Sequence, residues 1–272
     1  MSRARLYATD AIILRRVDFG EADRILTIMT PQAGKLRVIA KGARKMTSRK
    51  AGHVELFTRV RLLLARGRNF DIVSQAEAIE TYRGLREDLL RSTYGHYLCE
   101  LVDAFAQEGS EDIALYELLA EGLGWLAEAD DPALAGRYFE MRLLALTGYR
   151  PQLFKCARTD EVINIELPNI TSVAFSPVEG GVLSAPAARF ARDAFSVPVG
   201  GLRLLRVLQL KQFEDLRGLE INPAAHAQVE YTMCRYLQYV LERTLRSTHF
   251  LRLLESENAL AATQQASSPQ QP

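Results

Sequence analysis

The sequence predicts a multidomain α+β protein in which a five-stranded barrel precedes a helical bundle and a small irregular insert. Three observations support this fold class. Over the first 82 residues, short segments rich in β-branched and aromatic residues alternate with turn residues. Apolar residues then recur every three or four positions, the period of an α-helix. Between residues 148 and 184 that period is lost, and Gly and Pro divide the apolar pieces.

Five strands are expected in the N-terminal part, and they span residues 7–17, 24–30, 35–41, 54–65 and 70–82. Alternating polarity sets the core-facing positions, which we expect to be Leu36, Val38, Val60, Leu62 and Leu64. Five short strands in so short a segment favour a closed barrel, because closure leaves no strand edge exposed. The five-stranded barrel of this size is the OB-fold, so we expect an OB-fold over residues 1–82.

Residues 83–150 are expected to form a helical bundle. Apolar residues recur at helical spacing in three runs, which are broken at Gly109-Ser110 and at Asp130-Asp131-Pro132. Pro132 stands where a helix can begin. Three helices with short connections form an antiparallel bundle.

The remaining sequence is expected to form a small insert, further helices and a tail. The insert spans residues 151–187, with helical spacing returning at 186–195 and in two later runs. The C-terminal helices, over residues 188–258, complete the helical domain. Residues 259–272 are mostly Gln, Ser, Ala and Pro, and this composition predicts disorder.

Composition indicates a cytoplasmic protein. No apolar run approaches the length of a membrane helix or of the core of a secretory signal. Three cysteines, at positions 99, 156 and 234, cannot build a disulfide framework and indicate a reducing compartment.

The net charge of +1 conceals two oppositely charged parts. Residues 1–82 hold 16 basic and 8 acidic residues, whereas the rest holds 18 basic and 25 acidic residues. No Lys or Arg occurs between Ser92 and Gly136, where ten acidic residues fall. The asymmetry is typical of a basic part that binds nucleic acid or another anionic surface. The alternative is two solvated surfaces of opposite sign that pack together.

The strongest binding signal is the loop from Lys41 to Lys50, which has five positive charges and no acid. Such a loop binds phosphates without sequence preference, because each contact releases counterions. Basic residues on the strands add to it. The candidate DNA-binding residues are Lys35, Arg37, Lys41, Arg44, Lys45, Arg49, Lys50, Arg59 and Arg61. The nearby aromatic residues, which either stack on bases or belong to the core, are Tyr7, Phe19, Phe57 and Phe70.

Motifs for catalysis and for cofactors are missing from the sequence. There is no phosphate-cradling loop, dinucleotide-binding glycine motif, nucleophile elbow or paired zinc-binding histidine motif. Asp71, Glu77 and Glu80 lack the lysine that a metal-dependent nuclease places at close spacing. We therefore expect a protein that is not an enzyme, with no catalytic residue and no cofactor.

Several short stretches, in this order, resemble a known family. They are Gly20-Glu21-Ala22-Asp23-Arg24, Ala40-Lys41-Gly42-Ala43-Arg44, the run from Leu146 to Leu153 ahead of Cys156, and Phe175-Ser176-Pro177 ahead of Gly180-Gly181-Val182-Leu183. Over nearly the whole chain the sequence is similar to the RecO family, the bacterial recombination mediators of DNA repair. The resemblance implies an OB-fold, a helical bundle and a small insert.

The resemblance also implies a function and partners. It implies a nucleoid-associated protein that binds single- and double-stranded DNA and anneals complementary strands. With RecR, it helps load RecA onto DNA coated by single-strand-binding protein. A second class of function remains open, namely a protein–protein adaptor whose basic barrel docks an acidic partner instead of DNA.

One feature departs from the family's pattern. Many relatives carry two Cys-x-x-Cys pairs around the insert, which form a four-cysteine zinc site. Here Cys156 is followed by Thr159, and Ser184 and Ala187 stand where the second pair belongs. We therefore predict a degenerate zinc-finger-like insert that binds no metal.

The resemblance also suggests a site for the partner's acidic tail, which carries aromatic and apolar residues. Such a tail needs a cation beside an apolar groove. Arg137 and Arg142 flank Phe139 just after the segment that lacks positive charge, so these three are the candidate partner-tail-binding residues. The alternative is that both arginines offset acidic residues of the preceding helices.

Overall fold

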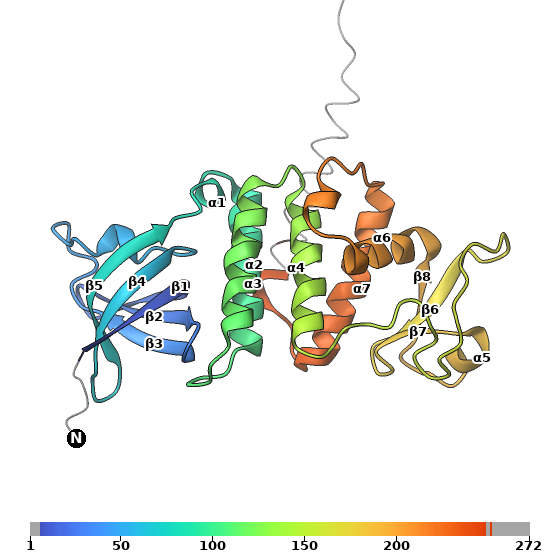
Figure 1. The fold of residues 1–272 in the computed structure, drawn as a ribbon, viewed down its shortest axis with the longest axis horizontal. Helices are drawn as coiled ribbons and strands as arrows, with labels where there is room; N and C mark the ends of the chain where they lie inside the picture. The colour runs from blue at the N-terminus through green and yellow to red at the C-terminus, as the bar shows by residue number, and fades with distance from the viewer. Residues whose placement is uncertain (1–5, 249–250, 252–272) are drawn as a thin grey trace, which may run out of the picture.

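The computed structural model describes residues 6–248 and residue 251. The chain is elongated, with a β-barrel at one end, helices in the middle and a small sheet at the other end (Figure 1). The acidic helical part therefore lies between the basic barrel and the insert.

The N-terminal part is a closed five-stranded barrel. Its strands are β1 (Leu6–Phe19), β2 (Asp23–Thr30), β3 (Gly34–Ala40), β4 (Arg59–Ala65) and β5 (Asp71–Glu80). They are hydrogen-bonded in the order β1-β2-β3-β5-β4, and β4 pairs with β1 to close the barrel. Val38, Val60, Leu62 and Leu64 fill its interior, as their alternation predicts, whereas Leu36 is only partly buried.

A β-bulge in β1 changes which side chains face the interior. The register shifts between Ile13 and Arg15, so one residue is left over on β1. Beyond the bulge, Arg15 lies opposite Thr27, and Arg16 lies opposite Leu26 of the barrel core. Arg15 therefore faces outward, while Arg16 lies on the side of the barrel interior near the end of the strand.

The strand predicted over residues 54–65 is wrong in its first half. β4 begins only at Arg59, and the short 3-10 helix η1 (Ala51–His53) lies before it. Phe57 has a φ of 67°, in the left-handed region, which an extended strand excludes. Its ring is 2% exposed. The segment turns at Phe57 to bury this ring instead of extending the strand.

The bundle consists of the short α1 (Gly84–Glu87) and the three expected helices, α2 (Leu89–Phe105), α3 (Ile113–Glu128) and α4 (Pro132–Leu146). An aspartate precedes each of the three long helices and caps it. The carboxylates of Asp88, Asp112 and Asp131 accept hydrogen bonds of 2.7, 3.0 and 3.0 Å from the backbone N–H three residues on. Some of the acidic residues in this part therefore serve as N-caps of helices.

The outer face of the barrel and the bundle share an apolar cluster that is separate from the core inside the barrel. Ile12, Leu14 and Met29, on the outer face of the barrel, belong to the same buried cluster as the helices. Gly95 of α2 lies against the Phe57 ring, where an added Cβ atom would be 3.2 Å from the ring carbons. Glycine at this position therefore lets the helix approach the barrel closely.

The remaining elements are β6 (Ser172–Ser176), β7 (Gly181–Leu183), α5 (Ala185–Ala188), β8 (Phe195–Pro198), α6 (Val199–Leu210), η2 (Glu214–Leu216) and α7 (Pro223–Leu241). The insert contains a three-stranded sheet in the order β7-β6-β8. Helical spacing over 186–195 is misleading, because α5 ends at Ala188 and Phe195 starts a strand. The Phe195 ring packs on Phe175 and Tyr231, with centroid distances of 5.7 and 5.3 Å. β8 thus lies beyond residue 187, where the insert was expected to end.

The predicted disordered tail, residues 259–272, lies outside the described residues. Within the described part of the chain, no helix combines the length and the apolar character needed to cross a bilayer.

An ion pair is buried in the bundle. Arg137 Nη1 lies 2.6 Å from Glu140 Oε1, and the Tyr97 hydroxyl from α2 donates to the same oxygen. Arg137 is 5% exposed and Glu140 is fully buried. Burial raises the pKa of the Glu140 carboxyl, and the neighbouring Arg137 guanidinium opposes that rise. Because both groups are buried away from water, each charge is stabilised mainly by the opposite charge of its partner.

Replacing Arg137 with Ala is expected to lower the free energy of unfolding by about 3–5 kcal/mol, because Glu140 is left as an unpaired buried charge. Urea denaturation measures the loss. The matched control is Arg217→Ala, which breaks an ion pair with Glu128 whose side chains are 58% and 71% exposed. This exposed pair contributes little. Equal losses in the two variants would contradict the special role of the buried pair.

Candidate nucleic-acid interface

The basic loop from Lys41 to Lys50 is anchored at its base. The Gly42 N–H donates to Asp23 Oδ1 over 2.8 Å, and the Arg44 N–H donates to the Ala22 carbonyl over 2.9 Å. Ala43, between them, is buried in the barrel core. A run of hydrogen-bonded turns follows and ends at η1. The loop is therefore presented from a fixed position on the barrel.

The cations of this loop differ in how free they are. Three are exposed and form no ion pair with any residue that the structure describes, namely Lys41, Lys45 and Arg49. Arg44 is exposed, but its Nε lies 3.3 Å from Asp18. Lys50 Nζ donates to the Val73 carbonyl over 2.9 Å, which ties the loop to β5. The first three are the cations most available to an anionic ligand.

Two predicted DNA-binding residues instead connect the barrel to the acidic helices. Lys35 Nζ lies 3.2 Å from the Asp103 carboxylate and donates to its backbone carbonyl over 2.6 Å. Arg59 Nε donates to the Tyr116 hydroxyl over 3.1 Å and lies near Glu117. The bundle therefore neutralises part of the positive charge of the barrel.

An open groove on the outer face of β1, β2 and β3 brings three cations together, Arg15, Lys35 and Arg37. Lys35 is paired with Asp103, whereas Arg15 and Arg37 are exposed. Acidic residues from α2 and the loop after it form one wall. Arg15 was not predicted as a binding residue from the sequence, because the face of β1 on which it lies depends on the bulge.

Arg61, the last of the predicted strand cations, is paired. Its guanidinium donates to both oxygens of Asp10 on the neighbouring strand, over 2.8 and 3.2 Å. It remains largely exposed, at 63% of its side chain. It therefore adds little uncompensated charge.

The four candidate aromatic residues have different environments. Phe57 is a core residue, so it is not available to stack on a base. The Tyr7 hydroxyl donates to Asp71 over 2.5 Å. The Arg37 guanidinium lies 5.2 Å from the centre of the Phe70 ring. Phe19, at the end of β1, is 51% exposed and is the most accessible of the four.

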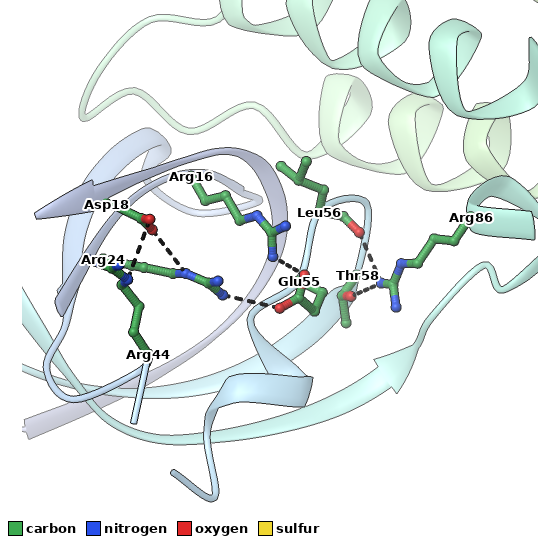
Figure 2. Close-up of polar contacts among 8 residues, drawn as sticks. All are labelled: Arg16, Asp18, Arg24, Arg44, Glu55, Leu56, Thr58 and Arg86. Carbon is green, nitrogen blue, oxygen red and sulfur yellow. Dashed lines mark hydrogen bonds and ion pairs between the residues drawn. The ribbon is translucent and has the colours of Figure 1, made fainter. Parts of the chain in front are cut away.

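A cluster of arginines lies at one end of the barrel, and the sequence analysis identified only one of them (Figure 2). This barrel-end cluster consists of Arg16, Arg24, Arg44 and Arg86 with Asp18 and Glu55. Its members come from the end of β1, the start of β2, the basic loop, the segment before β4, and α1. They were missed because they are scattered along the sequence and meet only when the barrel closes.

Ion pairs hold the cluster together. Glu55 pairs with Arg16 through one oxygen and lies 3.1 Å from Arg24 through the other. Asp18 lies 3.4 Å from Arg24 and 3.3 Å from Arg44. Burial, followed by the nearby positive charge of Arg24, lowers the pKa of Arg16. The guanidinium stays protonated at neutral pH, because its ordinary pKa is far above 7.

The predicted tail-binding groove is not present at this helix. Arg137 and Phe139 are buried, so neither can contact a partner in this structure. Arg142 donates to the carbonyls of Leu208 and Lys211 at the end of α6. The alternative expectation, that both arginines offset acids of the preceding helices, is also wrong. The carboxylate that pairs with Arg137 lies on its own helix, and Arg142 caps a helix carboxyl end.

The insert does not offer the donor set of a zinc site. Cys156 is buried, and its sulfur accepts hydrogen bonds from the hydroxyls of Thr159 and Ser184. Burial alone would raise the pKa of the Cys156 thiol, but these bonds and two backbone N–H groups lower it to about 6. One sulfur and two hydroxyls do not make a tetrahedral zinc site. Among the described residues, no cluster of three or more His, Cys, Asp or Glu is placed to hold a metal.

The fold and its charges define a class of protein in which a basic five-stranded barrel packs its outer face against a mainly acidic helical part. The family model for the N-terminal part of recombination protein O matches residues 1–82, and the model for its C-terminal part matches residues 86–249. The chain belongs to the RecO family, which confirms the resemblance seen in the sequence.

Relatives named DNA repair protein RecO align along nearly their whole length. The one from Roseiflexus sp. (strain RS-1) is 43% identical over 249 residues, covering 92% of this chain and 86% of the relative. The one from Pelotomaculum thermopropionicum is 39% identical, covering 91% and 94%. A third, from Dehalococcoides mccartyi strain BAV1, is 33% identical, covering 92% and 97%.

The purified protein is expected to contain no stoichiometric zinc, because the insert presents one thiolate and hydroxyls in place of four thiolates. Elemental analysis of the protein tests this directly. Chelators should leave the melting temperature unchanged, since no metal contributes to folding. About one zinc per chain, or a melting temperature that falls with chelator, would contradict the assignment.

Proposed function

We propose that this chain is a non-enzymatic recombination mediator of DNA repair that acts at the bacterial nucleoid. It binds single- and double-stranded DNA through the basic loop and the neighbouring surface of the barrel, which we assign as an OB-fold. It anneals complementary strands and, with RecR, helps load RecA onto DNA coated by single-strand-binding protein. The observation that carries the proposal is a set of exposed cations on a loop anchored to the barrel, Lys41, Lys45 and Arg49, which form no ion pair with any described residue.

Electrostatics favours a nucleic-acid backbone as the ligand of this surface. A cation with no internal partner holds solution anions loosely, and nucleic-acid phosphates displace them with a gain in entropy. The loop carries no carboxylate that would repel phosphates. The surface offers cations and an exposed aromatic ring, Phe19, but no helix of the barrel is placed to read bases in a groove. Binding is therefore independent of sequence.

Membership of the RecO family supports the mediator steps of the proposal. The relatives are named as DNA repair proteins. Annealing, the partnership with RecR and the loading of RecA are proposed on the basis of the family resemblance.

The second candidate function is that of an adaptor whose barrel docks an acidic protein. One observation favours it, because Lys35 and Arg59 already bind acidic side chains of the bundle. These barrel cations thus form ion pairs with carboxylates of the same chain, as they would with those of an acidic partner. Binding to DNA with no protein partner present separates the two functions.

Reversing the three unpaired loop cations, as Lys41→Glu, Lys45→Glu and Arg49→Glu together, is expected to weaken DNA binding strongly at low salt. The logarithm of the binding constant falls linearly with the logarithm of the salt concentration, and each neutralised phosphate contributes about 0.7 to the magnitude of that slope for single strands. Losing three such contacts should therefore reduce the magnitude of the slope by about 2. Fluorescence anisotropy of a labelled oligonucleotide across a salt series measures both quantities. The variant should also anneal complementary oligonucleotides more slowly.

The matched control makes the same change in charge outside the barrel. Arg189, Arg192 and Lys211 are exposed and lie in the insert and beyond α6, and their reversal to Glu should leave the salt slope nearly unchanged. Equal effects of the two triple variants would show that only net charge matters. Absence of salt-dependent binding by the wild-type protein would favour the adaptor.

A further inference from the structure

The barrel-end cluster holds more positive than negative charge. Three guanidinium groups, those of Arg16, Arg24 and Arg44, pair with two carboxylates, those of Asp18 and Glu55 (Figure 2). The guanidinium of Arg86 lies beside them without a carboxylate partner in the cluster, so the cluster as a whole holds two more positive than negative charges. Arg86 is held in place by neutral acceptors, the Leu56 carbonyl at 2.9 Å and the Thr58 hydroxyl at 2.6 Å. The excess charge marks the cluster as a place where an anion is favoured.

The charges of the cluster are partly shielded from water. The side chains of Arg16, Arg24 and Glu55 are 32%, 18% and 29% exposed. Like charges repel more strongly there than in bulk solvent, because the surrounding protein screens less. The charge of Arg86 adds to that of Arg24 in disfavouring the protonated form of Arg16. Glu55 relieves this repulsion from a position between two of the arginines.

Glu55 occupies the position that a backbone phosphate would take. Its two oxygens each bind one guanidinium, Arg16 on one side and Arg24 on the other (Figure 2). The two non-bridging oxygens of a phosphodiester present the same paired acceptors to arginines. The carboxylate therefore mimics the ligand for which such a pair of guanidiniums is suited.

The glutamate can leave without disturbing the barrel. Val54 and Phe57, on either side of it in sequence, are 0% and 2% exposed and hold the backbone of this segment. The Phe57 N–H also donates to the Ile13 carbonyl over 3.0 Å. Between these fixed points, the Glu55 side chain is 29% exposed, and it is the part of the segment that a change of rotamer would move.

We propose that the barrel-end cluster is a phosphate-binding site for nucleic acid in which Glu55 is an internal competitor that the phosphate displaces. The inference rests on the proposed DNA-binding function and adds to it a specific site and a restraint on affinity. Arg44 belongs to both the cluster and the basic loop, so a nucleic-acid backbone passes from the loop cations into the cluster. Because a ligand must first displace the Glu55 carboxylate, only a ligand that binds several arginines at once can occupy the cluster.

The test compares two variants that each remove one negative charge from the barrel. Glu55→Gln removes the competitor and keeps the shape of the side chain. Glu77→Gln is the matched control, because Glu77 is exposed on β5 and forms no ion pair with a described residue. Anisotropy with a labelled oligonucleotide at low salt measures affinity, and melting temperatures verify the fold. We expect Glu55→Gln to bind about five- to tenfold more tightly than the wild type, and Glu77→Gln to change affinity less than twofold.

A further variant tests whether the gain in DNA affinity of Glu55→Gln arises from phosphate binding in the barrel-end cluster. Adding Arg24→Gln to Glu55→Gln should return affinity to the wild-type level or below it, because the phosphate is then left with only one of its two guanidiniums. A gain that persists in the double variant would overturn the inference.

Failure of this inference is distinguishable from failure of the proposed function. If the wild type binds DNA and the loop variant does not, while Glu55→Gln matches Glu77→Gln or binds more weakly, then Glu55 is structural and the inference is wrong. If no form of the protein binds DNA, the proposed function fails and this inference fails with it.

A measurement on the wild-type protein keeps the test independent of any variant's folding. The side-chain Nε–Hε resonances of Arg16 and Arg24 can be followed by NMR during titration with a short unlabelled oligonucleotide. Phosphate in place of the Glu55 carboxylate should shift both resonances saturably and with the same affinity as the anisotropy titration. Resonances that stay unmoved at saturation would show that DNA binds outside the cluster.

Discussion

Burial of the outer face of the barrel against α2 fixes the position of everything that the barrel presents. Ile12, Leu14 and Met29 lie on that face and are buried with the helices. Each such side chain contributes about 1.5–3 kcal/mol when it leaves water, so the barrel is joined to the bundle by a core rather than by a flexible linker. Phe57 completes the contact at Gly95. The basic loop then lies away from the long helices, and α1 contributes Arg86 to the barrel-end cluster.

The opposite charges of the two parts have several physical roles. Asp112 and Asp131 start helices through capping bonds. Asp103 binds a barrel cation across the junction. The acidic helical part thus does more than repel anionic ligands, because it also neutralises the barrel cations nearest to it. What remains for an external anion is the subset of barrel cations that no carboxylate reaches.

Hydrogen bonds and aromatic packing stabilise the small sheet of the insert. Backbone hydrogen bonds connect Gln152 to both Gly180 and Val182, and the rings of Phe175, Phe195 and Tyr236 pack together. The Cys156 sulfur is surrounded by hydroxyl and N–H donors. Packing and hydrogen bonds hold this part of the chain.

The sequence by itself determined most of the barrel strands, the three long helices of the bundle and the inward faces of residues such as Val60 and Leu62, because alternation and helical period record local burial. It did not determine the turn at Phe57 or the strand β8, where packing against distant segments overrides the local pattern. Only the tertiary structure decided which partners the arginines bind and whether they are buried. Arg16 meets a carboxylate 39 residues away, and Arg142 binds a carbonyl 66 residues away. Arg137 is buried against Glu140 and Tyr97. A charged side chain leaves no periodic trace of its partners, since these depend on how distant segments pack. The geometry of the barrel-end cluster was therefore hidden until the barrel closed.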